Sequence, residues 1–336
     1  MERREFLGQA AFATAFAALL KSSAAGECPP ADCKLGILGG ADSPLDRRVR
    51  FHPVTIRVGA KTPFKALHVS DTHLNFASVR DLLTAKVDDL ALYEGRREVF
   101  DSLVPLAACV LKSRREKRIL LHTGDIWDYH SQANCQLAQD AFALAYDSFF
   151  AIGNHEINGH WVETRNEDWE TIRSEIERYL PNPTLCAAKV VHGVNFVSFD
   201  NNAEGEDRSA RQRELLAREF ARGLPVVLMC HFPLLSEEVR RDILNGEGQF
   251  VGCKRWEPKI LPYLVYGLRT RHERELNDWL LSQPNLKVVL CGHMHHRAVY
   301  SMGPRAVPMY IAGCAGLAEK RVTPDYGRDV FEIDFI

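Results

Sequence analysis

Five short polar segments contain the residues of this sequence whose types and spacing could do chemistry. Each segment follows a run of branched and aromatic residues of the kind that forms a buried strand. The segments are Asp71-Thr72-His73, Gly124-Asp125-Ile126-Trp127-Asp128, Gly153-Asn154-His155-Glu156, Cys230-His231 and Gly292-His293-Met294-His295. Because α/β sheets place their ligand crevice at the carboxyl ends of the strands, we expect these side chains to meet there.

The side chains of these segments favour a metal ion as their ligand. They offer imidazole nitrogens, carboxylates and one amide oxygen, with no cysteine besides Cys230 at the end of its apolar run. That donor set suits Mn, Fe or Zn better than Cu(I) or an iron–sulfur cluster. Asp71 and His73 are two residues apart, so an extended backbone would turn both side chains to one side, and the same holds for His293 and His295.

Together the segments resemble the motifs of the calcineurin-like metallophosphoesterase family. In chain order they give Asp-x-His, Gly-Asp-x-x-Asp, Gly-Asn-His-Glu, His and Gly-His-x-His, spanning Asp71 to His295. One such motif alone is an ordinary turn sequence, whereas five in the family's order are specific. The resemblance implies an α/β fold with two facing mixed β-sheets flanked by helices, and a metal site at the carboxyl ends of the strands.

The resemblance also implies two divalent transition-metal ions, Mn, Fe or Zn, that share one carboxylate. The ligands of the first ion would be Asp71, His73, Asp125 and His295. The ligands of the second ion would be Asp125, Asn154, His231 and His293. Two cations on a phosphate ester neutralise its charge, lower the pKa of a bridging water and orient the resulting hydroxide.

Two further residues are predicted to act in catalysis. His155, next to Asn154, resembles the family's general acid, and we expect its charged form to be available near neutral pH. The alternative role for His155 is that of a packing histidine. Asp128 is expected to orient a ligand or to pair with His155 rather than to bind metal. The sequence names no substrate-binding residue.

The sequence departs from two branches of the family near Asp128. Tyr129 follows Asp128 at the position where the Ser/Thr protein phosphatases carry Arg, which argues against phosphoprotein substrates. Asp128 itself stands where the purple acid phosphatases have an iron-binding Tyr, which argues against a purple ferric centre.

The overall composition favours one catalytic domain acting on a small molecule. The 336 residues carry a formal net charge of −2 with no basic tract, so no nucleic-acid partner is expected. The motifs run along most of the chain and cannot be separated into two domains without splitting the site. No transmembrane segment is expected in the mature chain. The expected partner is a small-molecule phosphate ester, and the oligomeric state is not predicted.

The first residues have the features of an export signal. Arg3-Arg4 precedes an Ala-rich apolar run, and small residues follow at Ser23-Ala24-Ala25. We predict a twin-arginine-type signal peptide over 1–25 and therefore a periplasmic or extracellular location. The alternative is an N-terminal helix of a cytoplasmic protein. Cys28 and Cys33 follow, as either a disulfide or two free thiols.

The rest of the chain divides into a linker and the catalytic domain. Residues 26–62 are predicted as a linker with a candidate edge strand at 54–58, and 63–336 as the metallophosphoesterase domain. Helices are expected at 97–115, 136–145, 167–179, 209–222 and from about 270. The irregular, aromatic-rich segment 236–268 is a candidate lid over the site, or alternatively a surface excursion with its own small core.

The sequence thus predicts a metal-dependent hydrolase acting on a phosphomonoester or phosphodiester, with hydroxide held by two metals and His155 as general acid. The alternative is a catalytically inactive metal-binding scaffold of the same fold. Such scaffolds tend to lose ligands, whereas this sequence retains all seven together with His155. A nuclease is disfavoured because no basic groove is evident.

Overall fold

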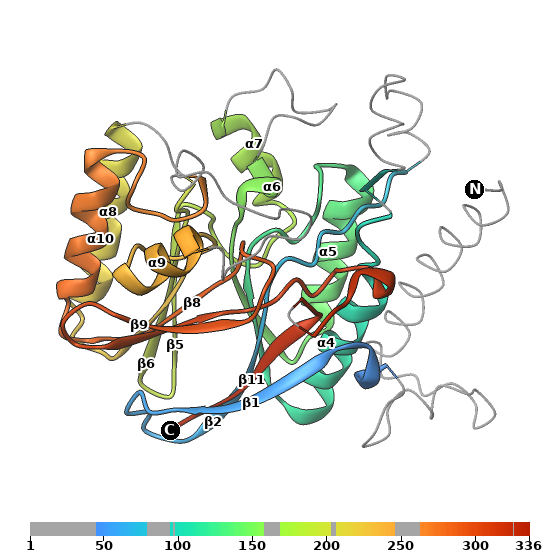
Figure 1. Cartoon of the computed structure of the whole chain (residues 1–336), viewed down its shortest axis with the longest axis horizontal. Coiled ribbons are helices and arrows are strands. Elements are labelled where there is room, and N and C mark those ends of the chain that lie inside the picture. Colours follow the sequence, from blue (N-terminus) through green and yellow to red (C-terminus); the bar gives the residue numbers. More distant parts are fainter. Residues whose placement is uncertain are drawn as a thin grey trace, which may run out of the picture.

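The computed structural model describes residues 45–78, 95–96, 98–157, 169–202, 206–245, 263–324 and 326–336. Two mixed β-sheets face each other, and helices cover their outer sides (Figure 1). The predicted α/β class, with two facing mixed sheets flanked by helices, is confirmed.

The first sheet has five strands and supplies three of the motif segments. Its strand order is β1 (Arg50–Ile56), β11 (Asp329–Phe335), β2 (Phe64–Val69), β3 (Ile119–Thr123) and β4 (Asp147–Ala151). Strands β2, β3 and β4 are parallel, and β11 runs antiparallel to β2. All five residues of β3 are buried, as expected for a parallel strand covered on both faces.

The second sheet has six strands and supplies the remaining two segments. Its order is β5 (Cys186–Val191), β6 (Val194–Phe199), β7 (Val226–Met229), β8 (Leu286–Cys291), β10 (Val307–Ile311) and β9 (Ala298–Met302). Strands β6, β7, β8 and β10 are parallel to one another, and the edge strands β5 and β9 run antiparallel to their neighbours.

Three apolar layers hold the sandwich together. Between the sheets, Leu121 and Phe149 of the first pack in one buried cluster with Phe196 and Val288 of the second. Helices α4 (Leu103–Glu116) and α5 (Gln132–Leu144) cover the outer face of the first sheet. Helices α8 (Glu206–Phe220) and α10 (Arg271–Ser282) cover that of the second (Figure 1).

The helices begin where local capping dictates, which shifts some predicted bounds. Helix α10 begins after Thr270, whose Oγ1 accepts the Glu273 N–H at 3.1 Å. The helix predicted at 97–115 begins only at Leu103, because Phe100 forms a bridge with Leu317 and Asp101 N–H donates to Gly316 O. The helices predicted at 136–145, 167–179 and 209–222 correspond to α5, α7 (Trp169–Ile176) and α8.

Several sequence predictions fall at the borders of the described residues. The predicted signal peptide 1–25, with Cys28 and Cys33, lies outside them. The strand expected at 54–58 is β1, which lies at the edge of the five-stranded sheet. The segment 236–268 begins as helix α9 (Glu237–Asn245), and its residues 246–262 lie outside the described part. Among the described residues, no helix combines the length and apolarity needed to cross a membrane.

Candidate metal centre

All five motif segments lie at the carboxyl ends of strands, and both sheets contribute. After β2, β3 and β4 of the five-stranded sheet come Asp71, His73, Asp125, Asn154 and His155. After β7 and β8 of the six-stranded sheet come His231, His293 and His295. The candidate site therefore lies where the two sheets present their strand ends to each other.

The structure gathers the predicted acidic and histidine ligands into two overlapping groups. Ligand atoms within 4.8 Å of one another come, in the first group, from Asp71, His73, Asp125 and His295. In the second group they come from Asp125, His231 and His293. Asp125 belongs to both groups, and its Oδ2 lies 3.7 Å from His73 Nε2 and 3.2 Å from His231 Nε2.

Left-handed backbone conformations aim the ligands at these groups. Among the described non-glycine residues, eight have positive φ, and five of them are predicted ligands. These are Asp71, His73, Asp125, His293 and His295. Such conformations cost about 1–3 kcal/mol each and persist only where the surroundings enforce them. The extended backbone predicted at Asp71 and His73, and likewise at His293 and His295, is therefore wrong. Asp71 and His73 still reach the same group, whereas His293 and His295 belong to different groups.

Main-chain hydrogen bonds enforce these conformations by tying the ligand loops together. Asp71 N–H donates to Gly124 O at 3.0 Å, and His73 N–H donates to Asp125 O at 2.9 Å. Gly153 must be glycine here, because a Cβ would lie 2.2 Å from Asp125 Oδ1. The loops are thus packed against each other with backbone in direct contact.

The buried carboxylate of Glu156 holds the loop that carries Asp125. Its Oε2 accepts the Gly153 and Asp125 N–H groups, and its Oε1 accepts those of Ile126 and Trp127, at 2.5–3.2 Å. Burial and the Asp125 charge raise the pKa of Glu156 to about 7, while the backbone donors oppose that rise. Glu156 belongs to a predicted motif, but this clamping role was not predicted.

Acids and histidines of the two groups stabilise each other's charges in the metal-free chain. Burial alone would lower the pKa of His73, but Asp128, Asp71 and Asp125 raise it to about 9. Asp125 and Asp71 raise the pKa of His231 to about 9 against the same burial effect. In return, the histidines hold the pKa values of Asp71 and Asp125 well below the usual range.

Asp128 is hydrogen-bonded to His73, the contact that one of its predicted roles requires. The His73 Nδ1–H donates to Asp128 Oδ1 at 3.0 Å, which leaves Nε2 facing the first group. Arg96, which the sequence analysis did not single out, donates from Nε and Nη2 to the two carboxylate oxygens of Asp128 at 2.6 and 2.5 Å. A carboxylate behind a metal-binding histidine fixes the ring orientation and raises the basicity of the ligand.

His155 lies beside Asp125 and turns one ring nitrogen toward it. Its Nδ1–H donates to the main-chain oxygen of Asp128 at 2.7 Å, and its Nε2 lies 3.9 Å from Asp125 Oδ2. Its side chain is 17 % exposed. Burial lowers the pKa of His155, although Asp125 and Asp128 oppose the effect, so the charged form is less available near neutral pH than the sequence suggested.

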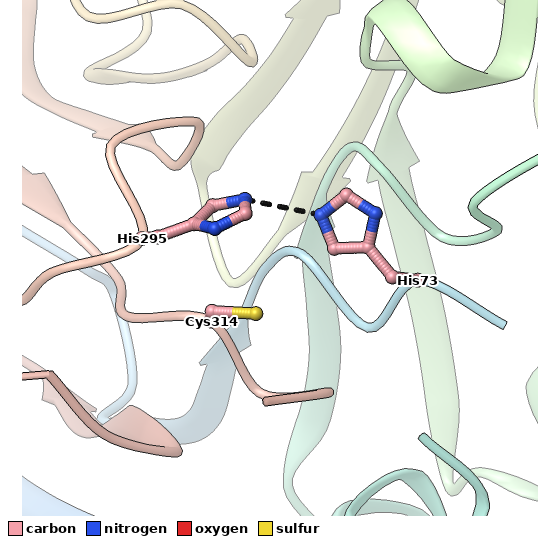
Figure 2. A group of neighbouring side chains, drawn as sticks. All are labelled: His73, His295 and Cys314. Atoms are coloured by element: carbon pink, nitrogen blue, oxygen red, sulfur yellow. Dashed lines mark hydrogen bonds between the residues drawn. The ribbon is translucent and has the colours of Figure 1, made fainter. Parts of the chain in front are cut away.

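Two more residues at the first group were missed as functional candidates. The Phe100 ring stacks on His73 with centroids 4.1 Å apart and an interplanar angle of 12°. Cys314, which belongs to none of the five motif segments, is buried beside His73 and His295 (Figure 2). The sequence did carry a signal for it, because Cys314 follows an apolar strand and a glycine, as Asp125, Asn154 and His293 do.

The donor set fits metal ions. Asp71 Oδ1 and Asn154 Oδ1 are buried without a hydrogen-bond partner, and such atoms call for an explanation. The Nε2 atoms of His73 and His295 approach to 3.1 Å. A cation between these acceptors would satisfy them, and imidazole with carboxylate and amide oxygen suits Mn, Fe or Zn.

The two-sheet fold with Asp and His groups at its strand ends is that of a metal-dependent phosphoesterase. The sequence matches the calcineurin-like phosphoesterase family over residues 64–297, more than half of its length. The chain therefore belongs to that family, as the motifs predicted. Comparison with curated proteins gave no match.

Several solved structures are similar at low identity. A dimetal phosphatase from Danio rerio is 12 % identical with a TM-score of 0.42, covering 76 % of this chain and 88 % of its own. A phosphopantetheinyl hydrolase from Mycobacterium tuberculosis is 13 % identical with a TM-score of 0.37, covering 77 % and 89 %. A protein assigned as a 5′-nucleotidase from Staphylococcus aureus is 12 % identical with a TM-score of 0.37, covering 76 % and 49 %. This chain thus spans about half the length of the last. With TM-scores below 0.5, these likenesses carry no argument about the substrate.

Proposed function

We propose that this chain hydrolyses a phosphomonoester or phosphodiester of a small molecule with two divalent transition-metal ions. The observation that carries the proposal is Asp125, whose carboxylate belongs to both ligand groups. A carboxylate shared by two cations is a direct way to hold them at the short separation used in two-metal hydrolysis. When bound, the ions would neutralise the ester and lower the pKa of a water between them.

The residues of the chain divide the remaining work. Asp71, His73 and His295 hold the first ion together with Asp125, and Asp128 fixes the orientation of His73. The second ion is held by Asp125, Asn154, His231 and His293. Asn154 comes at the start of helix α6 (Asn154–Ile157), and its buried Oδ1 has no hydrogen-bond partner, which supports this assignment.

His155 is the proton donor to the leaving group in this proposal. Its Nδ1–H is held by the Asp128 carbonyl, so the side chain cannot turn freely, and Nε2 is the nitrogen on the Asp125 side. A general acid must reach the departing oxygen directly or through one water, and His155 Nε2, 3.9 Å from the Asp125 Oδ2 shared by both ligand groups, is at the place where that oxygen would leave.

An inactive scaffold of the same fold is the weaker alternative. Loss of activity in such a protein would leave gaps among the ligands or at the proton donor. Here the side chains of the two ligand groups converge, and strained backbone is maintained at five ligands. Strain of this kind is stored where geometry serves function.

The test is metal content together with activity on generic substrates. Elemental analysis of protein from metal-supplemented medium should find about two transition-metal ions per chain. The metal-stripped protein should be inactive and regain hydrolysis of aryl phosphomonoesters or aryl phosphodiesters on addition of Mn. Activity that persists in chelator, with metal content near zero, would contradict the proposal.

We also propose that the protein is exported through the twin-arginine route to the periplasm or the cell exterior. The support is Arg3-Arg4 ahead of the apolar run at 6–20. Replacing both arginines by lysine should leave the precursor in the cytoplasm of a bacterial host that has this pathway. Unchanged delivery across the membrane would show that the leader is of another kind or is an N-terminal helix.

A further inference from the structure

Cys314 lies beside the first ligand group, although no motif contains it. It follows β10, it is fully buried, and its Sγ lies within 4.8 Å of a ring nitrogen of His73 and one of His295. Figure 2 shows the Cys314 sulfur below the dashed line that joins the Nε2 atoms of His295 and His73. A thiol is therefore in reach of the same space as the imidazoles.

The loop of Cys314 is fixed to the loop of Asp71 rather than placed beside it by chance. Ala315 N–H donates to Ser70 O at 3.1 Å, and Gly316 N–H donates to Asp71 O at 3.0 Å. The Cys314 thiol itself donates to Asp71 O at 3.2 Å. A Cβ at Gly316 would lie 1.8 Å from Thr72 O, so glycine is needed for this approach.

A second, independent observation points to a cation at this place. Asp71 is fully buried, and its Oδ1 has no hydrogen-bond partner. That oxygen lies 3.3 Å from His295 Nε2 and 3.7 Å from His73 Nε2. A buried oxygen and two imidazole nitrogens thus come together, and the thiol forms a second group with the same two nitrogens.

We propose that Cys314 is an additional metal ligand, supplying a thiolate to the ion held by Asp71, His73, Asp125 and His295. The proposal rests on the proposed metal-dependent function. On binding, the S–H bond breaks, the sulfur donates an electron pair to the cation, and the proton passes to water, with no change of oxidation state. Zinc accepts nitrogen at about 2.0–2.1 Å and sulfur at about 2.3 Å, so a nitrogen and a sulfur on one ion are at most about 4.4 Å apart. The Cys314 Sγ lies within 4.8 Å of both imidazole nitrogens but falls outside the group that these nitrogens form with the Asp71 and Asp125 carboxylates, so binding the same ion requires the Cys314 side chain to move toward them.

A thiolate would make the two metal positions chemically different. Soft sulfur favours Zn or Fe over Mn, whereas the second group offers only nitrogen and oxygen. The first position should then prefer the softer ion, and the second should accept harder ions such as Mn. The competing interpretation is a packing thiol. Burial and the Asp71 charge raise the pKa of Cys314 well above its usual value, so without metal the thiol stays protonated on Asp71 O.

Cobalt spectroscopy separates the two interpretations. Metal-stripped full-length protein is loaded with Co²⁺ alone, and its near-ultraviolet absorption is recorded. A thiolate on Co²⁺ gives an intense charge-transfer band that nitrogen and oxygen ligands do not give. The wild type should show the band and Cys314→Ser should lose it while still binding cobalt. Cys291→Ser is the matched control, because Cys291 is equally buried, donates to Tyr310 O and belongs to neither ligand group, so the band should persist.

The wild-type spectrum alone tests whether a thiolate binds the metal, even if Cys314→Ser does not fold. Cobalt bound at about two ions per chain without the band would overturn the thiolate ligand and leave the proposed function intact. Failure to bind cobalt at all would overturn both. In Cys314→Ser, the Zn-over-Mn preference of one position should fall by at least the 10–100-fold typical of losing even an outer-shell partner. An unchanged preference at both positions would contradict the proposal.

Discussion

The two halves of the candidate metal centre orient their histidines in different ways. In the first half, His73 donates to the Asp128 carboxylate, which is itself held by Arg96. In the second half, main-chain carbonyls take that place, since His231 Nδ1 lies 2.8 Å from Thr123 O and His293 Nε2 lies 3.1 Å from Tyr263 O. The histidines of the second half are therefore oriented by main-chain atoms. His73 of the first half is oriented by charged side chains, which single substitutions can remove.

This difference teaches where the centre can be tuned. A carboxylate behind a histidine makes the ring a stronger donor, whereas a carbonyl fixes its orientation without adding a charge. Point substitutions should therefore weaken the first half selectively, and only Asp125, which the halves share, should affect both equally.

Asp125→Ala should remove both ions and abolish hydrolysis. Asp125 is the only residue common to the two ligand groups among the described residues, so neither ion keeps a full ligand set without it. We expect the metal content to fall from about two ions per chain to near zero, and kcat/KM to fall by at least about 10⁴-fold. The measurements are elemental analysis and hydrolysis of an aryl phosphate.

The matched control for Asp125→Ala is Asp278→Ala, an exposed position on helix α10. It should leave metal content and activity unchanged. If Asp125→Ala kept one ion at full occupancy, the idea of a shared carboxylate would have to be abandoned.

His155→Ala should keep both ions. Its kcat/KM should fall most for esters whose leaving group most needs a proton. Proton transfer contributes on the order of 10²–10⁴-fold, which a poor alkoxide leaving group needs and a nitrophenolate hardly needs. The measurement is kcat/KM across esters whose leaving groups differ widely in pKa, with His272→Ala on helix α10 as control. An equal loss across the series, or loss of metal, would show that His155 is not the proton donor.

The sequence was enough to name the candidate ligands, because their motifs are local patterns that follow apolar strands and resemble those of a known family. Each predicted ligand follows the strand that was expected to precede it. It was not enough to find Arg96 or Phe100, since tertiary packing alone brings them to the first half, and Cys314 had no signal beyond the apolar strand and glycine that precede it. Phe100 is brought there by its bridge to Leu317, more than 200 residues away in sequence. Likewise, β11 lies between β1 and β2, a strand order that no local pattern specifies.

Metal affinity should rise with pH in both halves. In the metal-free chain, surrounding carboxylates raise the pKa values of His73 and His231 to about 9. Below that pH each ring must lose a proton before it can bind, so affinity weakens as pH falls. At pH 7 this competition with protons weakens the metal affinity roughly 100-fold per ring, and the weakening should vanish as pH rises through about 9.

The proton release can be counted by calorimetry in buffers of different ionisation enthalpy. At pH 7 each half should release about one proton from the histidine whose pKa is raised when it binds Zn²⁺, and the first half should release about one more if Cys314 binds as a thiolate. The same groups give the metal-free protein a stability contribution that is complete below their unfolded pKa of about 6.5 and lost as pH rises through about 9. Affinity that is constant between pH 6 and 9 would contradict the assignment.

The smallest predicted effect belongs to the side chains behind His73. Asp128→Asn keeps an oxygen that can accept the His73 Nδ1–H but removes the charge, so the first ion should bind about 10–100-fold more weakly. Arg96→Gln acts one contact further out, through Asp128, and should weaken that ion by less than about 10-fold. The second ion should be unaffected in both variants, because its histidines rest on the Thr123 and Tyr263 carbonyls. Stepwise Zn²⁺ binding measured against a competing chelator resolves the two ions. If Asp128→Asn weakened both ions equally, the halves would be coupled through Asp125 rather than positioned independently, and the contrast between charged and main-chain support would not hold.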